Sequence, residues 1–237
     1  MSHSDGIQNR IKLEVDLVEI NRKSYMKSRI ALFLHHPKCS VQSANGIIEA
    51  LEHNYKFKIF TRHEVERDFF DDVDVVCFPG GFGDADSYDY LLPEHISHIR
   101  EFVHRGGKYL GICMGAYWAG SYYFNILNNV EPVQYIKQPG AVTRRPHAKA
   151  MPVTWNNEQH HMYFYDGCTF TGAGSYETIA TYPYDLPMAI IQDNIGLIGC
   201  HPESQQHWYD EYSWLKGQWP GPTQYKLLDR FVAKLLQ

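Results

Sequence analysis

A cysteine between two glycines is the residue of this chain best placed to do chemistry. Gly111, Cys113 and Gly115 form a Gly-x-Cys-x-Gly pattern that follows an apolar run, residues 108–112, and precedes a segment with helical spacing. The pattern is the cysteine form of the nucleophile elbow, a strained turn from strand to helix that lifts a reactive side chain above a sheet. Glycines are needed there because neighbouring backbone passes close to the turn. The N-terminal end of the following helix favours a thiolate over a thiol, and the N–H group of Met114 is placed to donate to an oxyanion.

A thiolate nucleophile needs a base, and the base needs a group that orients it. His201 and Glu203 belong to one tripeptide, His-Pro-Glu, at the end of a later apolar run. The Glu203 carboxylate can reach the second imidazole nitrogen of His201, which would fix its tautomer and stabilise the imidazolium. We therefore predict that Cys113, His201 and Glu203 form a catalytic set. Taken one at a time, the elbow also fits a buried structural cysteine, and the tripeptide also fits a surface turn.

A glycine-rich loop, residues 79–83 (Pro-Gly-Gly-Phe-Gly), supplies a third element of the site. It follows an apolar run, so the amides of Gly80 and Gly81 are predicted to approach a substrate carbonyl as further oxyanion donors. A phosphate-binding loop is the competing interpretation, but the Lys-Ser/Thr ending and glycine spacing of such loops are missing. A simple glycine turn is the third interpretation.

Short apolar runs alternate with helical segments from Arg29 onward. The runs predicted to be strands are residues 30–34, 55–60, 73–78 and 108–112, and helices are expected over 41–53, around 96–103 and over 114–124. This alternation predicts an open, mostly parallel sheet with helices on both faces. Ligands of such sheets bind beyond the carboxyl ends of the strands, so His35, Gly80 and Cys113 are expected to converge there.

The second half of the chain is predicted to contain shorter strands, several of them antiparallel. They are expected at residues 151–155, 162–165, 178–182, 188–192 and 195–200, followed by a helix over 225–236. No repeat or linker interrupts the sequence, so we expect one domain, residues 29–237, after an extension, residues 1–28. Apolar residues alternate with charged ones in that extension, which fits either an added edge strand or an arm onto a second copy in a homodimer.

Composition and charge argue against several classes of protein. The 237 residues carry a net charge of -5, so no basic field favours nucleic acid. No apolar run reaches the roughly 18 residues that a membrane span needs, and the first residues lack the apolar middle of a signal peptide, so a cytoplasmic location is expected. The five cysteines form no Cys-x-x-Cys pair and the 13 histidines show no helical metal spacing, so we expect neither a metal site nor a cofactor.

The three motifs, in this order along residues 29–204, resemble those of the class I glutamine amidotransferase-like superfamily. The resemblance implies a flavodoxin-like α/β fold, a three-layer sandwich with a mostly parallel central sheet. It implies Cys113 as the nucleophile that attacks an amide carbonyl, with His201 as base and Glu203 as the group that orients it. It also implies that the oxyanion hole consists of the amides of Gly80, Gly81 and Met114.

One position departs from that superfamily. Its glutamine-hydrolysing members carry a glutamine four residues after the nucleophile, where this chain has Tyr117. The run 113–117 and the segment 163–170 look more like the amidotransferase-like domain at the N-terminus of some eukaryotic biotin-protein ligases. We expect Tyr117, His35 and Phe82 to contact the substrate.

Three functions fit these observations. The first is a cysteine-nucleophile hydrolase or amidotransferase that acts on a small-molecule amide through a thioester. The second is a glutaminase subunit that is active only when a synthetase or ligase partner docks. The third is a ligand-binding or regulatory module that keeps the elbow without catalysis. The complete Cys-His-Glu set favours the first.

Overall fold

The computed structural model describes residues 27–34, 41–81 and 88–237. His35 and Phe82 lie outside these ranges, as does the predicted extension apart from Lys27 and Ser28. Their roles therefore stay predictions.

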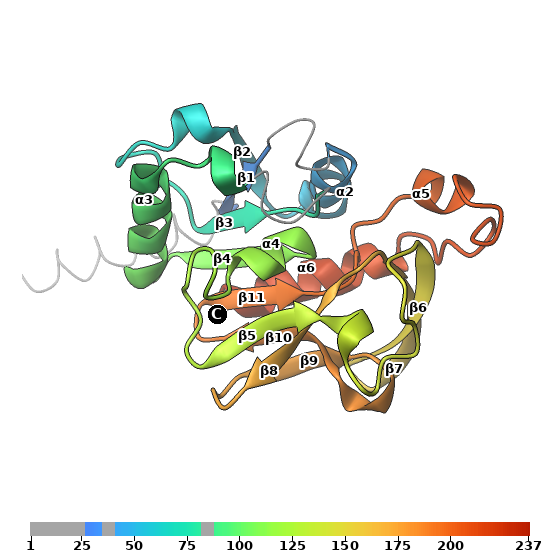
Figure 1. Cartoon of the computed structure of the whole chain (residues 1–237). Coiled ribbons are helices and arrows are strands. Elements are labelled where there is room, and N and C mark those ends of the chain that lie inside the picture. The colour runs from blue at the N-terminus through green and yellow to red at the C-terminus, as the bar shows by residue number, and fades with distance from the viewer. Residues whose placement is uncertain (1–26, 35–40, 82–87) are drawn as a thin grey trace, which may run out of the picture.

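One sheet of nine strands runs through the protein in the order β2-β1-β3-β4-β11-β10-β9-β6-β7 (Figure 1). Its parallel half consists of β1 (Arg29–Phe33), β2 (Lys56–Phe60), β3 (Val75–Phe78), β4 (Lys108–Ile112) and β11 (Ile195–Ile198). Its antiparallel half consists of β10 (Pro187–Gln192), β9 (Glu177–Thr181), β6 (Lys149–Trp155) and β7 (Glu158–Phe164). The predicted α/β class is confirmed, and the later antiparallel strands extend the same sheet.

A small antiparallel pair, β5 (Val130–Gln134) with β8 (Cys168–Gly172), lies beside the main sheet. The sequence analysis did not predict these two strands. Pro132 stands inside β5, and a proline within a run argues against a central strand. A two-stranded ribbon, in which both strands are edges, accommodates it.

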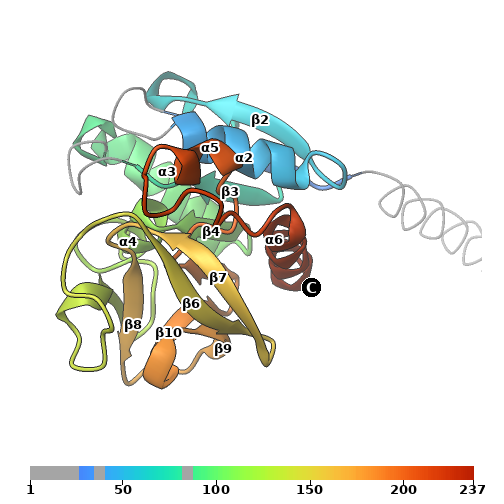
Figure 2. The same ribbon diagram turned by 90° about the vertical axis from the view of Figure 1, so that its right-hand side faces the viewer.

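Helices cover both faces of the parallel half (Figure 2). They are α2 (Val41–Leu51), α3 (Pro93–His104), α4 (Met114–Trp118) and α6 (Thr223–Leu235). A further helix, α5 (Gln206–Asp210), packs beside β6 and β7 of the antiparallel half, and short 3-10 helices stand at Arg62–Glu64, Tyr88–Tyr90, Tyr135–Lys137 and Pro183–Asp185. Alternate residues of each strand point to opposite faces. In β1, Ile30 and Leu32 join the cluster that α2 and α6 cover, whereas Ala31 and Phe33 join the cluster that α3 and α4 cover. The result is the three-layer arrangement that the superfamily resemblance implies.

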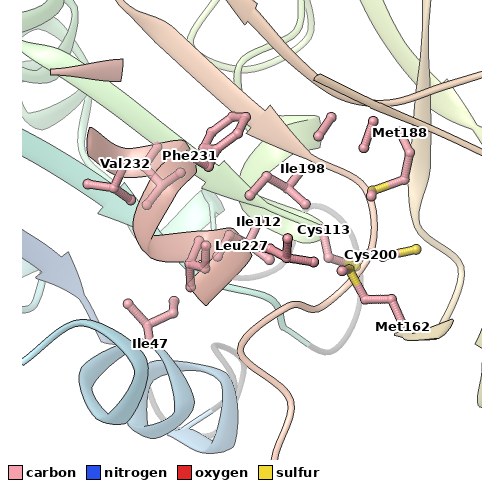
Figure 3. Packing of buried hydrophobic residues seen from close by; sticks show 14 of the residues in the cluster. Ile47, Ile112, Cys113, Met162, Met188, Ile198, Cys200, Leu227, Phe231 and Val232 are labelled. Atoms are coloured by element: carbon pink, nitrogen blue, oxygen red, sulfur yellow. The ribbon is translucent and has the colours of Figure 1, made fainter. Parts of the chain in front are cut away.

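The cluster beneath α2 and α6 reaches the nucleophile region. Figure 3 shows Ile47 of α2 and Leu227 of α6 packed over Ile112 and Ile198, with Cys113 where the two strands end. Burial of this apolar surface stabilises the fold by roughly 25 cal/mol for each Å². Because Cys113 belongs to the same cluster, this burial also stabilises the position of the elbow.

The helix after the elbow is shorter than predicted, because α4 ends at Trp118 and not near residue 124. The chain folds back after Trp118, so that the N–H of Phe124 donates to the Trp118 carbonyl at 2.8 Å and the N–H of Asn125 donates to the Gly120 carbonyl at 2.9 Å. Within the described residues, no helix is both long and apolar enough to cross a membrane.

Candidate active site

Cys113 occupies a strained turn between β4 and α4. Its φ is 50° and its ψ is -103°, a conformation that residues with a Cβ rarely adopt and that strains the backbone. The turn is held from both sides: the Cys113 N–H donates to the Ile198 carbonyl at 2.8 Å, and the Cys113 carbonyl accepts from the Ala116 N–H at 3.0 Å. Hydrogen bonds from the neighbouring strand and from the helix thus hold the conformation that the elbow pattern predicts.

Both glycines of the elbow pattern stand where a side chain would collide with backbone. A Cβ at Gly111 would lie 2.4 Å from the Gly115 carbonyl oxygen. A Cβ at Gly115 would lie 1.9 Å from the carbonyl oxygen of Phe78, the last residue of β3. The end of β3, the end of β4 and the start of α4 are therefore in direct backbone contact, as close approach at an elbow requires.

His201 and Glu203 follow β11, the strand next to β4. Both are buried, at 6% and 0% exposure, and His201 Nδ1 lies 2.8 Å from Glu203 Oε1. The edges of Tyr163 and Trp208 pack around the imidazole, with ring centroids 5.8 Å and 5.4 Å from it. The imidazole is thus enclosed by aromatic rings on one side and fixed by a carboxylate on the other.

The electrostatic environment keeps the imidazole charged. Burial lowers the pKa of His201, but the Glu203 carboxylate and the Cys113 side chain outweigh burial and raise that pKa to about 10. A hydrogen bond between the side chains of Cys113 and His201 contributes to the rise. The structure therefore brings together the three residues of the predicted catalytic set, from two different strand ends.

Ser43 of α2 joins this group, and the sequence analysis did not identify it. It is fully buried, and its Oγ donates to Glu203 Oε1 at 2.7 Å. The same helix approaches Glu203 closely, because a Cβ at Gly46 would lie 2.2 Å from the Glu203 carbonyl oxygen. No local pattern marks Ser43, since a serine in the first turn of a helix is common and its partner is 160 residues away.

The glycine loop begins against the imidazole of His201. A Cβ at Gly80 would lie 2.6 Å from His201 Cε1, so only glycine fits there. The Gly80 N–H donates to Ser43 Oγ at 3.0 Å, whereas Gly81 and Met114 line a cavity together with Cys113. Of the three amides predicted to donate to an oxyanion, that of Gly80 is thus hydrogen-bonded to Ser43. The other two belong to Gly81 and Met114, which lie at the cavity wall.

This cavity has a volume of about 880 Å³. Tyr117 lines it, as predicted for a residue that contacts substrate, but its hydroxyl donates to the carbonyl of Asp166 at 3.2 Å. The Tyr165 carbonyl, one residue earlier, lies 3.8 Å from Cys113 Sγ. Tyr117 therefore supports the turn that faces Cys113, and contact of its ring with a substrate stays a prediction.

Among the described residues, those of the cavity wall that carry a charge are Glu131, Lys137 and Asp166. Asp166 has a φ of 52°, and its Oδ2 accepts from Gln134 Nε2 at 2.9 Å. Burial raises the pKa of the Asp166 carboxyl, while the Gln134 hydrogen bond and the Lys137 charge oppose that rise. Two carboxylates against one ammonium give the cavity a net negative charge when all three are ionised.

The charge of the cavity is expected to select between alkylating reagents of similar size. In Asp166→Asn, the rate of Cys113 alkylation by anionic iodoacetate should rise roughly fivefold relative to neutral iodoacetamide, because about 1 kcal/mol of repulsion between nearby charges is removed. The rates are measured at pH 8 by mass spectrometry of the Cys113 peptide. Asp193→Asn is the matched control, because Asp193 is exposed and has a φ of 53°. An equal change in both variants would contradict a local effect of Asp166.

No metal centre is evident in the part of the chain that the structure describes. There, no three His, Cys, Asp or Glu side chains are grouped so that they could hold a metal ion. The four described cysteines, Cys77, Cys113, Cys168 and Cys200, are free thiols.

The fold is shared with structures of glutamine amidotransferases. A chain of PurLQS from Thermotoga maritima is similar with a TM-score of 0.60 and 17% identity, over 89% of this chain and 100% of that chain. A glutamine amidotransferase from the same organism gives a TM-score of 0.60 at 13% identity, over 90% and 100%. A further glutamine amidotransferase structure gives a TM-score of 0.59 at 17% identity, over 87% and 98%. The protein therefore has the class I glutamine amidotransferase-like fold.

Within that class, residues 36–134 match the family described as "Biotin-protein ligase, N terminal". The match contains the glycine loop and Cys113, covers fewer than half of the residues and ends before His201. The resemblance to the superfamily and to this branch is confirmed. No curated protein sequence matches the chain.

Proposed function

We propose that the protein is a cysteine-nucleophile enzyme that hydrolyses, or transfers the amide nitrogen of, a small amide through a thioester. One observation carries this proposal: Cys113 sits in a strained elbow at the end of a cavity, hydrogen-bonded to a His201 whose imidazolium Glu203 stabilises. A thiol beside a protonated, carboxylate-bound imidazole is the arrangement that activated cysteines require.

The chemistry follows from these positions. The Cys113 thiolate attacks the amide carbonyl carbon, and the N–H groups of Gly81 and Met114 stabilise the oxyanion that forms. The carbon–nitrogen bond breaks as His201 gives its proton to the leaving amine, which leaves a thioester on Cys113. Water then attacks the thioester, His201 takes the proton of that water, and the carbon–sulfur bond breaks to release the acid. His201 thus acts first as acid and then as base.

Selective labelling of Cys113 tests the proposal without knowledge of the substrate. An ordinary thiol titrates near pH 8.5, so only about three in a thousand such thiols are thiolates at pH 6. A chloroketone analogue of glutamine, or iodoacetamide, should therefore label Cys113 at pH 6 roughly a hundredfold faster than an ordinary thiol. His201→Ala should remove this advantage, because no imidazolium then stabilises the thiolate.

Labelled peptides are quantified by mass spectrometry from pH 5 to pH 10. His98→Ala is the control, because His98 lies on α3 and contacts the Val65 carbonyl, away from the cavity. Slow labelling of Cys113 with the pH dependence of an ordinary thiol would contradict the proposal and favour a non-catalytic binding module.

A second candidate is a glutaminase subunit that needs a synthetase or ligase partner. The observation in its favour is the exposed aromatic rim of the cavity, where Tyr122 is 90% exposed and Tyr165 is 46% exposed. Ammonia release from glutamine only after addition of a co-purified, ATP-using protein would support this candidate. Release by the isolated chain would exclude it.

A further inference from the structure

A chain of buried hydrogen bonds joins the glycine loop to the catalytic histidine through Ser43. The Gly80 N–H donates to Ser43 Oγ at 3.0 Å, Ser43 Oγ donates to Glu203 Oε1 at 2.7 Å, and His201 Nδ1 lies 2.8 Å from the same oxygen. Ser43 comes from α2, whereas His201 and Glu203 come from the turn after β11, and none of the three is more than 6% exposed.

The direction of each hydrogen bond is fixed by chemistry. A backbone N–H can only donate, so Ser43 Oγ must be the acceptor from Gly80. An ionised carboxylate can only accept, so the Ser43 hydroxyl hydrogen points to Glu203. This leaves the Nδ1 hydrogen of His201 as the second donor to Glu203 Oε1, and the other ring nitrogen faces Cys113.

Glu203 depends on these two donors for its orientation. The carboxylate is fully buried, and within the described residues its Oε2 atom has no hydrogen-bond partner. A buried charge needs compensation by hydrogen bonds and counter-charges. Both come through Oε1, from Ser43 on one side and from His201 on the other.

Among the described residues, the groups on which the Glu203 charge acts include no second cation. Besides His201, its charge acts on Cys200, Tyr209 and Tyr225. Burial raises the pKa of each of these three groups, so all are neutral near pH 7. Cys113 is the remaining titratable group that acts on His201.

We propose that Ser43 is a positioning residue of this site. Its hydroxyl holds the Glu203 carboxylate toward His201 and, through Gly80, holds the loop that presents Gly81 beside Cys113. One hydroxyl thereby couples the orientation of the base to the position of the oxyanion loop. This inference rests on the proposed function, because it assigns Ser43 to the same reaction.

The packing around Ser43 makes the coupling rigid. Gly46, one turn further along α2, brings that helix into direct contact with the Glu203 backbone, and Gly80 brings the loop against the imidazole. At both positions any Cβ would overlap its neighbour by a large margin. Helix, carboxylate and loop are therefore in direct contact, and the Ser43 hydrogen bonds hold them together.

The test compares Ser43→Ala with Ser204→Ala. Ser204 is also fully buried and adjoins Glu203, but its Oγ contacts Gln224 and Tyr209 and not the catalytic set. Both variants lose one buried hydroxyl, so both should lose similar thermal stability. The readout is the pH profile of Cys113 alkylation by iodoacetamide. In Ser43→Ala the midpoint should move up by about one pH unit and the rate at pH 6 should fall roughly tenfold, as expected when a hydrogen bond to a charged group is lost.

A second experiment places Ser43→Ala in a protein that already carries Glu203→Gln. If Ser43 acts through Glu203, adding Ser43→Ala to Glu203→Gln should cause no further shift of the profile. Equal profiles for Ser43→Ala and Ser204→Ala, or a full additional shift in the double variant, would overturn the inference. The proposed function is judged separately, by whether Cys113 of the unchanged protein reacts rapidly at pH 6.

Discussion

Replacing Cys113 with alanine is expected to abolish hydrolysis of any amide that the protein turns over, while the fold stays intact. Removal of the nucleophile in a comparable enzyme lowers the rate by roughly a millionfold. No other described thiol can replace it, because Cys77, Cys168 and Cys200 are fully buried, and burial raises the pKa of Cys168 and Cys200. Alanine keeps a Cβ and therefore tolerates the positive φ no worse than cysteine does.

Ammonia release from a panel of small primary amides measures this loss, and the unfolding midpoint measures the fold. Cys77→Ala serves as the control, because it removes a buried thiol from the neighbouring strand β3 and should leave turnover nearly unchanged. Retained turnover in Cys113→Ala would exclude the thioester mechanism. Loss of turnover in both variants would instead point to damage of the fold.

Turnover is expected to fall at high pH and not at neutral pH. In the proposed mechanism His201 must be protonated to give a proton to the leaving amine, and its pKa is about 10, above the ordinary value of about 6.5. Turnover of the unchanged protein should therefore persist through neutral pH and fall as the pH rises through about 10. The free energy of unfolding follows the same pKa. The ion pair between His201 and Glu203 contributes fully to it below about pH 6.5, and this contribution is lost as the pH rises to about 10.

The parts of the site that sequence could predict are those carried by short-range patterns. Gly111 and Gly115 flank Cys113 at fixed spacing, and backbone contact explains both glycines. His201 and Glu203 lie two residues apart, so their contact needs only a strand end and a turn. Alternation of strands and helices then predicts that these strand ends converge, because the carboxyl ends of parallel strands lie at one edge.

The parts that sequence could not predict depend on contacts between distant residues. Ser43 meets Glu203 across 160 residues, and Tyr117 meets the Asp166 carbonyl across 49 residues. Neither pair has a local pattern, since the first depends on how α2 packs against the turn after β11 and the second on how α4 packs against the turn after β7. The early end of α4 at Trp118 has a local cause instead, because the N–H groups of Phe124 and Asn125 donate to the carbonyls of Trp118 and Gly120 and the chain folds back.

Replacing Gly115 with alanine is expected to destabilise the whole protein, because the new methyl group would lie 1.9 Å from the Phe78 carbonyl oxygen. Such overlap with backbone cannot be relieved by a side-chain rotation, so β3 and α4 must move apart. Overpacking typically costs up to about 3 kcal/mol, and a backbone clash should reach or exceed that value. For a domain of this size, that corresponds to a fall of roughly 10 °C in the unfolding midpoint.

Thermal unfolding followed by circular dichroism measures the effect, with Gly140→Ala as the matched control. A Cβ at Gly140 would meet the flexible tip of Leu186 at 3.3 Å, so that variant should unfold within a few degrees of the unchanged protein. Cys113 alkylation adds a second readout, because separation of β3 from α4 also displaces the elbow and should slow labelling at pH 6. Equal midpoints for the two variants would mean that the elbow can widen at little cost, and that backbone contact between β3 and α4 does not hold Cys113 in its strained conformation.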